Sequence, residues 1–330
     1  MHDQAQSPKP ILWLVIPCFN EEEVLPITAP LFLEKITKLA DAGRISQKSR
    51  VVFVDDGSSD STWSIIQQLS NQDERFGGLR LSRNRGHQNA LLCGLMEARR
   101  YCDAAISVDC DGQDDINAID QMVEHFLAGD DIVFGVRSDR STDSAFKRGS
   151  AQAFYKLMGR FGTETIYNHA DYRLLSAQAL EALAEFGEVN LFLRGMVLQL
   201  GFPYSVVTYE RHERIAGQSH YPLKKMLALA IDGITSLSIV PIRLVSMIGL
   251  IFSILGFVGV IWALVSFALG SAIVGWSSTI VLISLIGGIQ LLSLGVIGEY
   301  VGKTYLESKA RPRYIVADRT WQPHHRVYKG

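Results

Sequence analysis

The chain has 330 residues, of which 48% are hydrophobic and 20% charged, and this is enough for one large domain or two ordinary ones. Its net charge of −2 hides an asymmetry: residues 1–210 carry 20 Lys and Arg against 29 Asp and Glu, whereas residues 211–330 carry 12 against 5. A basic and apolar C-terminal third suits an anionic membrane surface better than nucleic acid, and four cysteines without a Cys-x-x-Cys pair argue against a zinc site or a disulfide framework.

The N-terminal two fifths of the chain alternates short apolar runs with helical patterns. Residues 1–10 are polar, so we expect no cleavable signal peptide. Strands are predicted at 11–16, 51–54, 79–82, 104–108 and 132–136, with helices between them such as 62–69 and 88–100. This alternation predicts an α/β domain with a mostly parallel, doubly wound sheet. The first strand is not followed by Gly-x-Gly-x-x-Gly, which argues against an ordinary dinucleotide-binding domain.

Polar side chains follow the predicted strands, where ligands bind in open α/β sheets. They are Asn20, Glu21, Asp55, Asp56, Arg83, Asp109, Asp111 and Arg137. A carboxylate such as Asp56 could accept hydrogen bonds from a base or a ribose, and Arg83 and Arg137 could pair with phosphate. A residue of this kind, taken singly, is more often a surface charge or a helix cap.

The densest group of acids lies at 106–115, where an apolar strand ends in Asp-Cys-Asp-Gly-Gln-Asp-Asp. Asp109 and Asp111 are separated by one residue, and in a turn both carboxylates can reach one hard cation such as Mg²⁺ or Mn²⁺. The alternative is a solvated acidic turn that caps the helix starting near Asp115.

The pattern is less regular between residues 142 and 221. It indicates an amphipathic helix at 146–161, a short strand at 171–175 that begins with Asp171, and a helix at 190–200. The loop at 210–221 contains Arg211 and Arg214 and a flexible Gly217. This loop could close over a diphosphate, or it could be a solvated basic linker.

Residues 244–298 contain no Asp, Glu, Lys, Arg or His. Helices at 244–269 and 277–298 would be about 39 and 33 Å long, enough to cross a bilayer core of about 30 Å. We therefore predict two transmembrane helices rather than a buried hairpin of a soluble protein. Basic residues flank them at Arg243 and at Lys303, Lys309, Arg311 and Arg313, which predicts a plasma-membrane protein with its catalytic domain and both termini in the cytoplasm. Residues 216–242 read as an interfacial amphipathic helix region, between a domain at 1–215 and a membrane segment at 243–302, and residues 303–330 as a basic tail.

These segments together resemble the polyprenyl-phosphate glycosyltransferases of glycosyltransferase family 2, most closely the bactoprenol glucosyltransferases. The likeness covers nearly the whole chain and lies in residues 15–22 (Val-Ile-Pro-Cys-Phe-Asn-Glu-Glu), 54–58, 82–86, 109–114, 137–143, 171–175 (Asp-Tyr-Arg-Leu-Leu), 190–195, 213–217, 298–302 and 311–314. Cys110, Gly112 and Asp115 replace the Ala, Leu and Pro usual in the family's acidic motif, and His220 stands where Lys is common.

The resemblance implies a GT-A fold, a nucleotide-diphosphate sugar, a divalent metal (Mg²⁺ or Mn²⁺) and a lipid phosphate acceptor. By the motifs it shares, the nucleotide pocket would be formed by Pro17, Asn20, Glu21, Asp56 and Arg83, and the metal and diphosphate site by Asp109, Asp111 and Gln113. Asp171 matches the suspected catalytic base, and Arg211 and Arg214 match basic residues near the diphosphate or the lipid phosphate.

The expected activity is inverting transfer of a hexose, with UDP-glucose as the first choice of donor, to undecaprenyl or another polyprenyl phosphate at the cytoplasmic membrane face. The product would serve cell-envelope glycan or lipopolysaccharide modification, and the family favours homo-oligomers. Because a phosphate monoester is largely ionised at pH 7, we hypothesise that Asp171 orients the acceptor more than it removes a proton. The alternatives are UDP-N-acetylglucosamine, UDP-galactose, GDP-mannose or an aminoarabinose-type donor, or a non-catalytic nucleotide-binding membrane adaptor.

Overall fold

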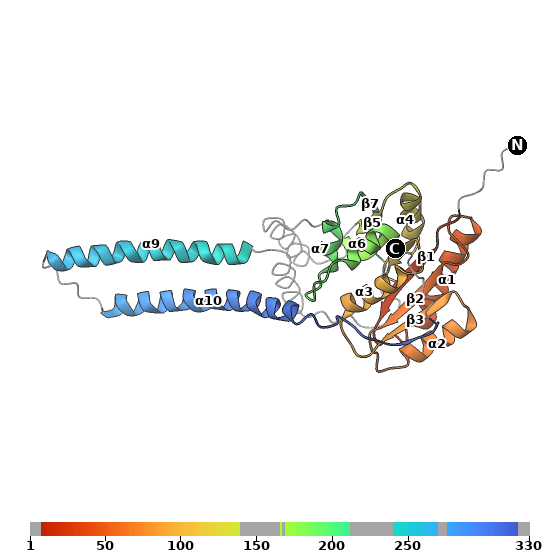
Figure 1. Ribbon diagram of the computed structural model, residues 1–330, viewed down its shortest axis with the longest axis horizontal. Coiled ribbons are helices and arrows are strands. Elements are labelled where there is room, and N and C mark those ends of the chain that lie inside the picture. Colours follow the sequence, from red (N-terminus) through yellow and green to blue (C-terminus); the bar gives the residue numbers. More distant parts are fainter. Residues whose placement is uncertain (1–7, 139–165, 167–168, 212–239, 270–275, 323–330) are drawn as a thin grey trace. The chain divides into compact units, whose positions relative to one another are not determined.

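A computed structural model describes residues 8–138, 166, 169–211, 240–269 and 276–322 (Figure 1). It contains two compact units: one comprises Met1–Tyr155, Glu164–Pro222 and Pro312–Gly330, and the other Lys156–Thr163 and Leu223–Arg311. The helix predicted at 146–161 and most of the interfacial region predicted at 216–242 lie outside the described residues.

The first unit is built on an eight-stranded sheet in the order β7-β5-β6-β4-β1-β2-β3-β8. The strands are β1 (Leu12–Cys18), β2 (Arg50–Asp55), β3 (Phe76–Leu81), β4 (Ala104–Ser107), β5 (Ile132–Arg137), β6 (His169–Ser176), β7 (Tyr204–Tyr209) and β8 (Val316–Arg319). β6 and β8 pair antiparallel with their neighbours, and the other pairs are parallel. The predicted α/β fold with a mostly parallel sheet is confirmed.

Side chains alternate along the strands between two cores, one on each face of the sheet. Along β1, Leu12, Leu14 and Ile16 enter one core, while Trp13 and Val15 enter the other. Helices α1 (Leu25–Asp41), α2 (Thr62–Gln72) and α4 (Ala118–Leu127) pack into the first core, and α3 (His87–Ala98), α6 (Ala177–Ala184) and α7 (Leu193–Gln199) into the second. Because both faces are covered, the strands are continuous apolar runs, which is why they were visible in the sequence.

Two strands depart from the parallel arrangement that alternating strands and helices predict. β6 includes the strand predicted at 171–175, but it runs antiparallel between β4 and β5, with Arg173 opposite Ser107 of β4. β8 lies in the segment that the sequence indicated only as a basic tail, and it adds an antiparallel edge strand to β3. The start of β6 therefore reaches the edge where β4 ends.

The second unit contains two long apolar helices, α9 (Val240–Ala268) and α10 (Trp276–Ser308), which contact each other. Both are long and apolar enough to cross a membrane, with mean hydropathy 2.1 over Val240–Gly259 and 1.4 over Leu285–Ser308, and neither window is buried within the chain. α10 extends ten residues beyond the predicted end at 298, through Lys303.

Candidate active site

The carboxyl ends of β1, β2, β3, β4 and β5 meet at one edge of the sheet, where the polar residues predicted from the sequence gather. Antiparallel β6 brings its first residues to the same edge, so Asp171 comes next to the turn that follows β4. Ser107, the last residue of β4, donates a hydrogen bond through its hydroxyl to the backbone carbonyl of Asp171. This contact fixes the start of β6 against the end of β4.

Asp56, directly after β2, is 2% exposed and accepts hydrogen bonds from the backbone N–H groups of Arg85 (2.7 Å) and Gly86 (2.8 Å). Desolvation raises its pKa, although these two hydrogen bonds oppose the rise. Gly57 has φ +70°, and a Cβ there would lie 2.6 Å from the backbone of Arg83. Glycine thus lets the loop after β2 pack directly on the loop after β3.

Asn20 and Glu21 connect the loop after β1 to the loop after β2. Asn20 adopts φ +54°, and its side-chain oxygen accepts a 2.9 Å hydrogen bond from the N–H of Ser59. The N–H of Glu21 donates to Thr62 Oγ1 at 2.8 Å. Pro17 is buried inside β1, and Arg83 is exposed on the loop after β3. The structure therefore gives Asn20 a local structural contact, and the nucleotide-binding role of these four residues stays a prediction.

Asp109 and Asp111 lie in the turn after β4, as the sequence indicated. Asp111 is 7% exposed and accepts a 3.1 Å hydrogen bond from the N–H of Gln113. Desolvation raises the pKa of Asp109 to about 6; His87 opposes the rise, and the negative charges of Asp114, Asp171 and Asp111 add to it. Negative charge is thus concentrated at the end of β4.

Asp171 is held differently from Asp109. Its carboxylate accepts hydrogen bonds from Arg173, two residues along β6, and from Arg194 of α7 at 3.0 and 3.2 Å. Burial would raise the pKa of Asp171, but the charges of Arg194 and Arg173 outweigh it and hold the pKa well below its ordinary value. Asp171 is therefore an ionised and fully ion-paired carboxylate.

His87, the first residue of α3, lies between the two carboxylates. Its Nε2 is 3.6 Å from Asp109 Oδ1 and 3.7 Å from Asp171 Oδ2. The preceding Gly86 has φ +86°, a conformation that L side chains rarely adopt, and Gly86 also donates its N–H to Asp56. The turn at Gly86 therefore bonds to Asp56 of the predicted nucleotide pocket and places the next residue, His87, beside Asp109 and Asp171.

A second cluster surrounds Asp114. Its carboxylate accepts a 2.6 Å hydrogen bond from the Tyr209 hydroxyl, and the Arg137 guanidinium lies 3.5 Å from the same oxygen. Desolvation would lower the pKa of Arg137, but the charges of Tyr209 and Asp114 outweigh it and raise that pKa. Arg211, which follows β7, donates to the side-chain oxygen of Gln113. Two predicted cations are thus brought beside the acidic turn.

The acidic turn has oxygen donors that fit a hard divalent cation. Within the described ranges, no group of three or more His, Cys, Asp or Glu is placed to hold a metal ion. Two carboxylates and the Gln113 amide oxygen are nevertheless the ligand types of Mg²⁺ or Mn²⁺, which often leave positions for water and substrate phosphates. Desolvation, with the neighbouring carboxylates, raises the pKa of Asp109 to about 6, and a bound cation would favour its ionised form.

The sequence prediction missed His87, Arg173 and Arg194 as site residues. Arg173 had a signal, because residues two apart in a strand point to the same face, so it shares the face of Asp171. Arg194 lies in the segment 190–195 that carries the family resemblance, but no role was assigned to it, and His87 had no signal, because its position depends on how the start of α3 packs against the sheet. Arg214 lies outside the described residues.

Comparison with known proteins identifies the family of the chain. The profile described as "Glycosyl transferase family 2" matches residues 13–184. An uncharacterised glycosyltransferase of Bacillus subtilis is 45% identical over 93% of this chain and 91% of its own length. A prophage bactoprenol glucosyl transferase homolog of Escherichia coli is 40% identical (92% and 97%), and the bactoprenol glucosyl transferase of Shigella phage SfX is 39% identical (93% and 98%).

Solved structures give a more distant likeness. The glucosyl-3-phosphoglycerate synthase of Mycobacterium tuberculosis, in complex with Mn²⁺, UDP-glucose and phosphoglyceric acid, is 16% identical, with a TM-score of 0.42 over 69% of this chain and 78% of that one. The family profile spans the sheet from β1 through β6 and includes the acidic turn and Asp171. The chain belongs to glycosyltransferase family 2 and is a glycosyltransferase with a GT-A-like α/β fold.

Proposed function

We propose that this glycosyltransferase moves a glucosyl group from UDP-glucose to undecaprenyl phosphate, or a similar polyprenyl phosphate, at the cytoplasmic face of a membrane. The observation that carries the proposal is the state of Asp171, an ionised carboxylate between Arg173 and Arg194 at the edge of the acidic turn. The relatives named bactoprenol glucosyl transferase, matched over nearly their whole length, support the choice of glucose and of a lipid acceptor.

The state of Asp171 favours an acceptor that is already ionised. A general base works best when its pKa lies near the working pH, and the arginines hold the pKa of Asp171 far below that. An alcohol acceptor would need a stronger base. A phosphate monoester loses its second proton near pH 6, so it can attack the anomeric carbon without one. Asp171 then fixes Arg194 and His87 beside the acceptor.

The donor lies on the other side of the same edge. Asp56 would bind the nucleoside, while Arg137 and Arg211 would pair with the diphosphate. Asp109, Asp111 and Gln113 would hold a divalent ion, which supplies Lewis-acid stabilisation of the departing nucleoside diphosphate. The bond from the anomeric carbon to the diphosphate breaks as the phosphate oxygen bonds from the opposite face, and the configuration inverts.

The apolar helices explain why such an enzyme is held at a membrane. A long prenyl chain stays in the bilayer, so its phosphate is presented only at the surface. α9 and α10 are long enough to span the hydrocarbon core, and we propose that they do so with both termini in the cytoplasm. Lys303, Lys309 and Arg311 follow the apolar part of α10, as the positive-inside rule expects of a cytoplasmic flank.

The proposal is tested by incubating membranes that contain the protein with undecaprenyl phosphate, Mn²⁺ or Mg²⁺, and one radiolabelled donor at a time. The donors are UDP-glucose, UDP-N-acetylglucosamine, UDP-galactose and GDP-mannose. We expect label from UDP-glucose in the organic extract, and its loss with a chelator. Label from a different donor would correct the sugar, and no label from any donor with folded protein would contradict transfer to this lipid.

A further inference from the structure

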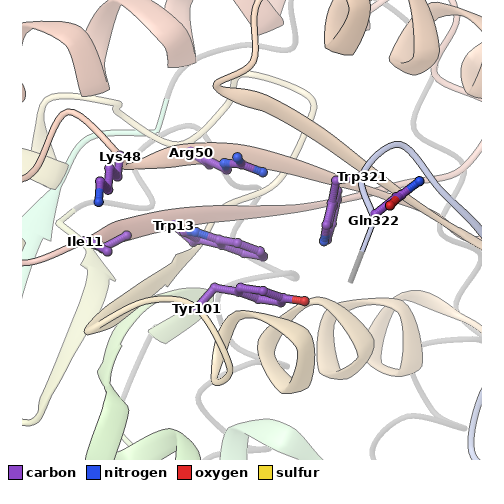
Figure 2. Close-up of a pocket in the computed structure, with 7 residues that line it drawn as sticks. All are labelled: Ile11, Trp13, Lys48, Arg50, Tyr101, Trp321 and Gln322. Atoms are coloured by element: carbon purple, nitrogen blue, oxygen red, sulfur yellow. The ribbon is translucent and has the colours of Figure 1, made fainter. Parts of the chain in front are cut away.

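A cavity of about 270 Å³ lies at the edge of the sheet opposite the active site (Figure 2). Its walls come from the starts of β1 and β2, the turn after α3 and the residues after β8. Trp13 and Arg50, which line it, are partners in the register of β1 and β2. The active-site residues follow the far ends of these strands, and a strand of seven residues is roughly 20 Å long. The cavity is therefore a separate site.

Three aromatic rings form one corner of this cavity. The rings of Trp13 and Tyr101 stack, with centroids 5.3 Å apart and planes 4° apart. The Trp321 ring stands at 86° to that of Trp13, at 5.7 Å, and Figure 2 shows it upright beside the stacked pair. Trp13 is 2% exposed and covered by Tyr101, so a planar ring in the cavity would stack on the partly exposed rings of Tyr101 and Trp321, and stacking on aromatic side chains tolerates different bases.

Trp321 is fixed in place by the strand beneath it. A Cβ at Gly77 of β3 would lie 2.9 Å from the indole, so only glycine leaves it room. The neighbouring Thr320 accepts a 2.9 Å hydrogen bond from the N–H of Gly78. Within the described part of the chain, the buried indole N–H of Trp321 has no hydrogen-bond partner. Buried indole N–H groups are usually paired, so this unpaired one is unusual.

The charge of the cavity is positive. Lys48 and Arg50 line it beside the aromatic corner, and none of the described residues that line it is acidic (Figure 2). Guanidinium and ammonium groups pair well with phosphate, which a planar guanidinium can bind through two hydrogen bonds. The cavity thus combines a surface for a flat ring with cations for a compact anion.

We propose that this cavity binds a nucleoside monophosphate, with the base on the aromatic corner and the phosphate on Lys48 and Arg50. Since Trp321 follows β8, the bound nucleotide holds the C-terminal segment against the sheet. Binding here is independent of sugar transfer, because no residue of the cavity belongs to the active site.

Equilibrium dialysis of the full-length protein in detergent against radiolabelled AMP tests this proposal. We expect one AMP per chain, with binding about tenfold weaker or more in Arg50→Ala, because a charged phosphate contact is lost. Trp321→Leu should weaken it as well. Arg44→Ala is the matched control, since Arg44 pairs with Glu124 outside the cavity and its loss should leave binding unchanged.

Asp56→Asn separates this cavity from the donor site. Retention of AMP binding in Asp56→Asn together with its loss in Arg50→Ala supports the proposal, provided that thermal unfolding shows Arg50→Ala to be folded. Absence of AMP binding at millimolar concentration, or binding that is lost in Asp56→Asn and kept in Arg50→Ala, would overturn it.

Discussion

The end of β4 and the start of β6 lie side by side, but their carboxylates are held in opposite ways. Asp109 lies among other acids, and desolvation with their repulsion raises its pKa to about 6. Asp171 is more completely enclosed, yet Arg194 and Arg173 hold its pKa far below the ordinary value. Two arginines neutralise the charge of Asp171, whereas in the acidic turn several carboxylates lie close to one another. The proposal of a metal-bound donor on one side and an ionised acceptor on the other rests on this difference.

The largest expected effect comes from removing one carboxylate of the acidic turn. Asp111→Asn should lower the rate of sugar transfer by roughly 10²- to 10³-fold, since a metal ion contributes several kcal/mol of charge stabilisation in the transition state. Binding of Mn²⁺, measured by electron paramagnetic resonance, should weaken in parallel. If the variant transferred sugar at the wild-type rate, the acidic turn would have no part in the chemistry.

The arginines that pair with Asp171 should affect the stability of the protein as well as the rate of transfer. Arg173 is 1% exposed and bonds both Asp171 and the carbonyl oxygen of Leu193. Arg173→Met should lower the free energy of unfolding by about 3 kcal/mol, because it leaves a buried carboxylate with one partner fewer. Arg194→Gln, at a side chain 34% exposed, should cost less. Denaturant unfolding in detergent measures both, and equal losses would contradict the assignment of Arg173 as the buried anchor.

Replacing Asp109 should have the smallest effect on stability, and it should raise the free energy of unfolding, whereas the two arginine variants lower it. The folded-state pKa of Asp109, about 6, lies above the ordinary 3.8, so the folded state holds the proton more tightly. Its contribution to stability therefore falls as the pH rises from about 4 to about 6 and is constant above that. Asp109→Asn should raise the free energy of unfolding at pH 7 by about 1 kcal/mol, allowing for partial exposure, while transfer is lost. Lower stability of the variant at pH 7 would refute this.

The sequence predicted the parts of the fold that repeat a local pattern. The five strands in the first 136 residues are apolar runs with polar ends, and burial on both faces makes such runs continuous. The polar residues at their ends could be placed at one edge because parallel strands share their direction. β8 could not be foreseen, since four residues from the C-terminal segment pair with β3 across more than 200 positions of sequence.

The acidic turn and Asp171 were identified as site residues, but the state of their charges was not. The antiparallel course of β6 sets Asp171 beside Asp109, and the sequence does not encode strand direction locally. Arg194 reaches Asp171 from α7, and His87 reaches it from α3, so both contacts depend on tertiary packing. The view of Asp171 as an orienting residue rather than a base is consistent with its low pKa and stays a prediction.

The pH dependence of transfer in the wild type and in Asp171→Asn tests this account most directly. Transfer of labelled glucose to undecaprenyl phosphate would be measured from pH 5 to pH 9, with saturating donor and metal. Asp171→Asn should lower the rate by the same factor at every pH and keep the rise near pH 6, which belongs to the acceptor phosphate. A rise that is present in the wild type and missing from Asp171→Asn would show that Asp171 takes the proton, and would contradict the account.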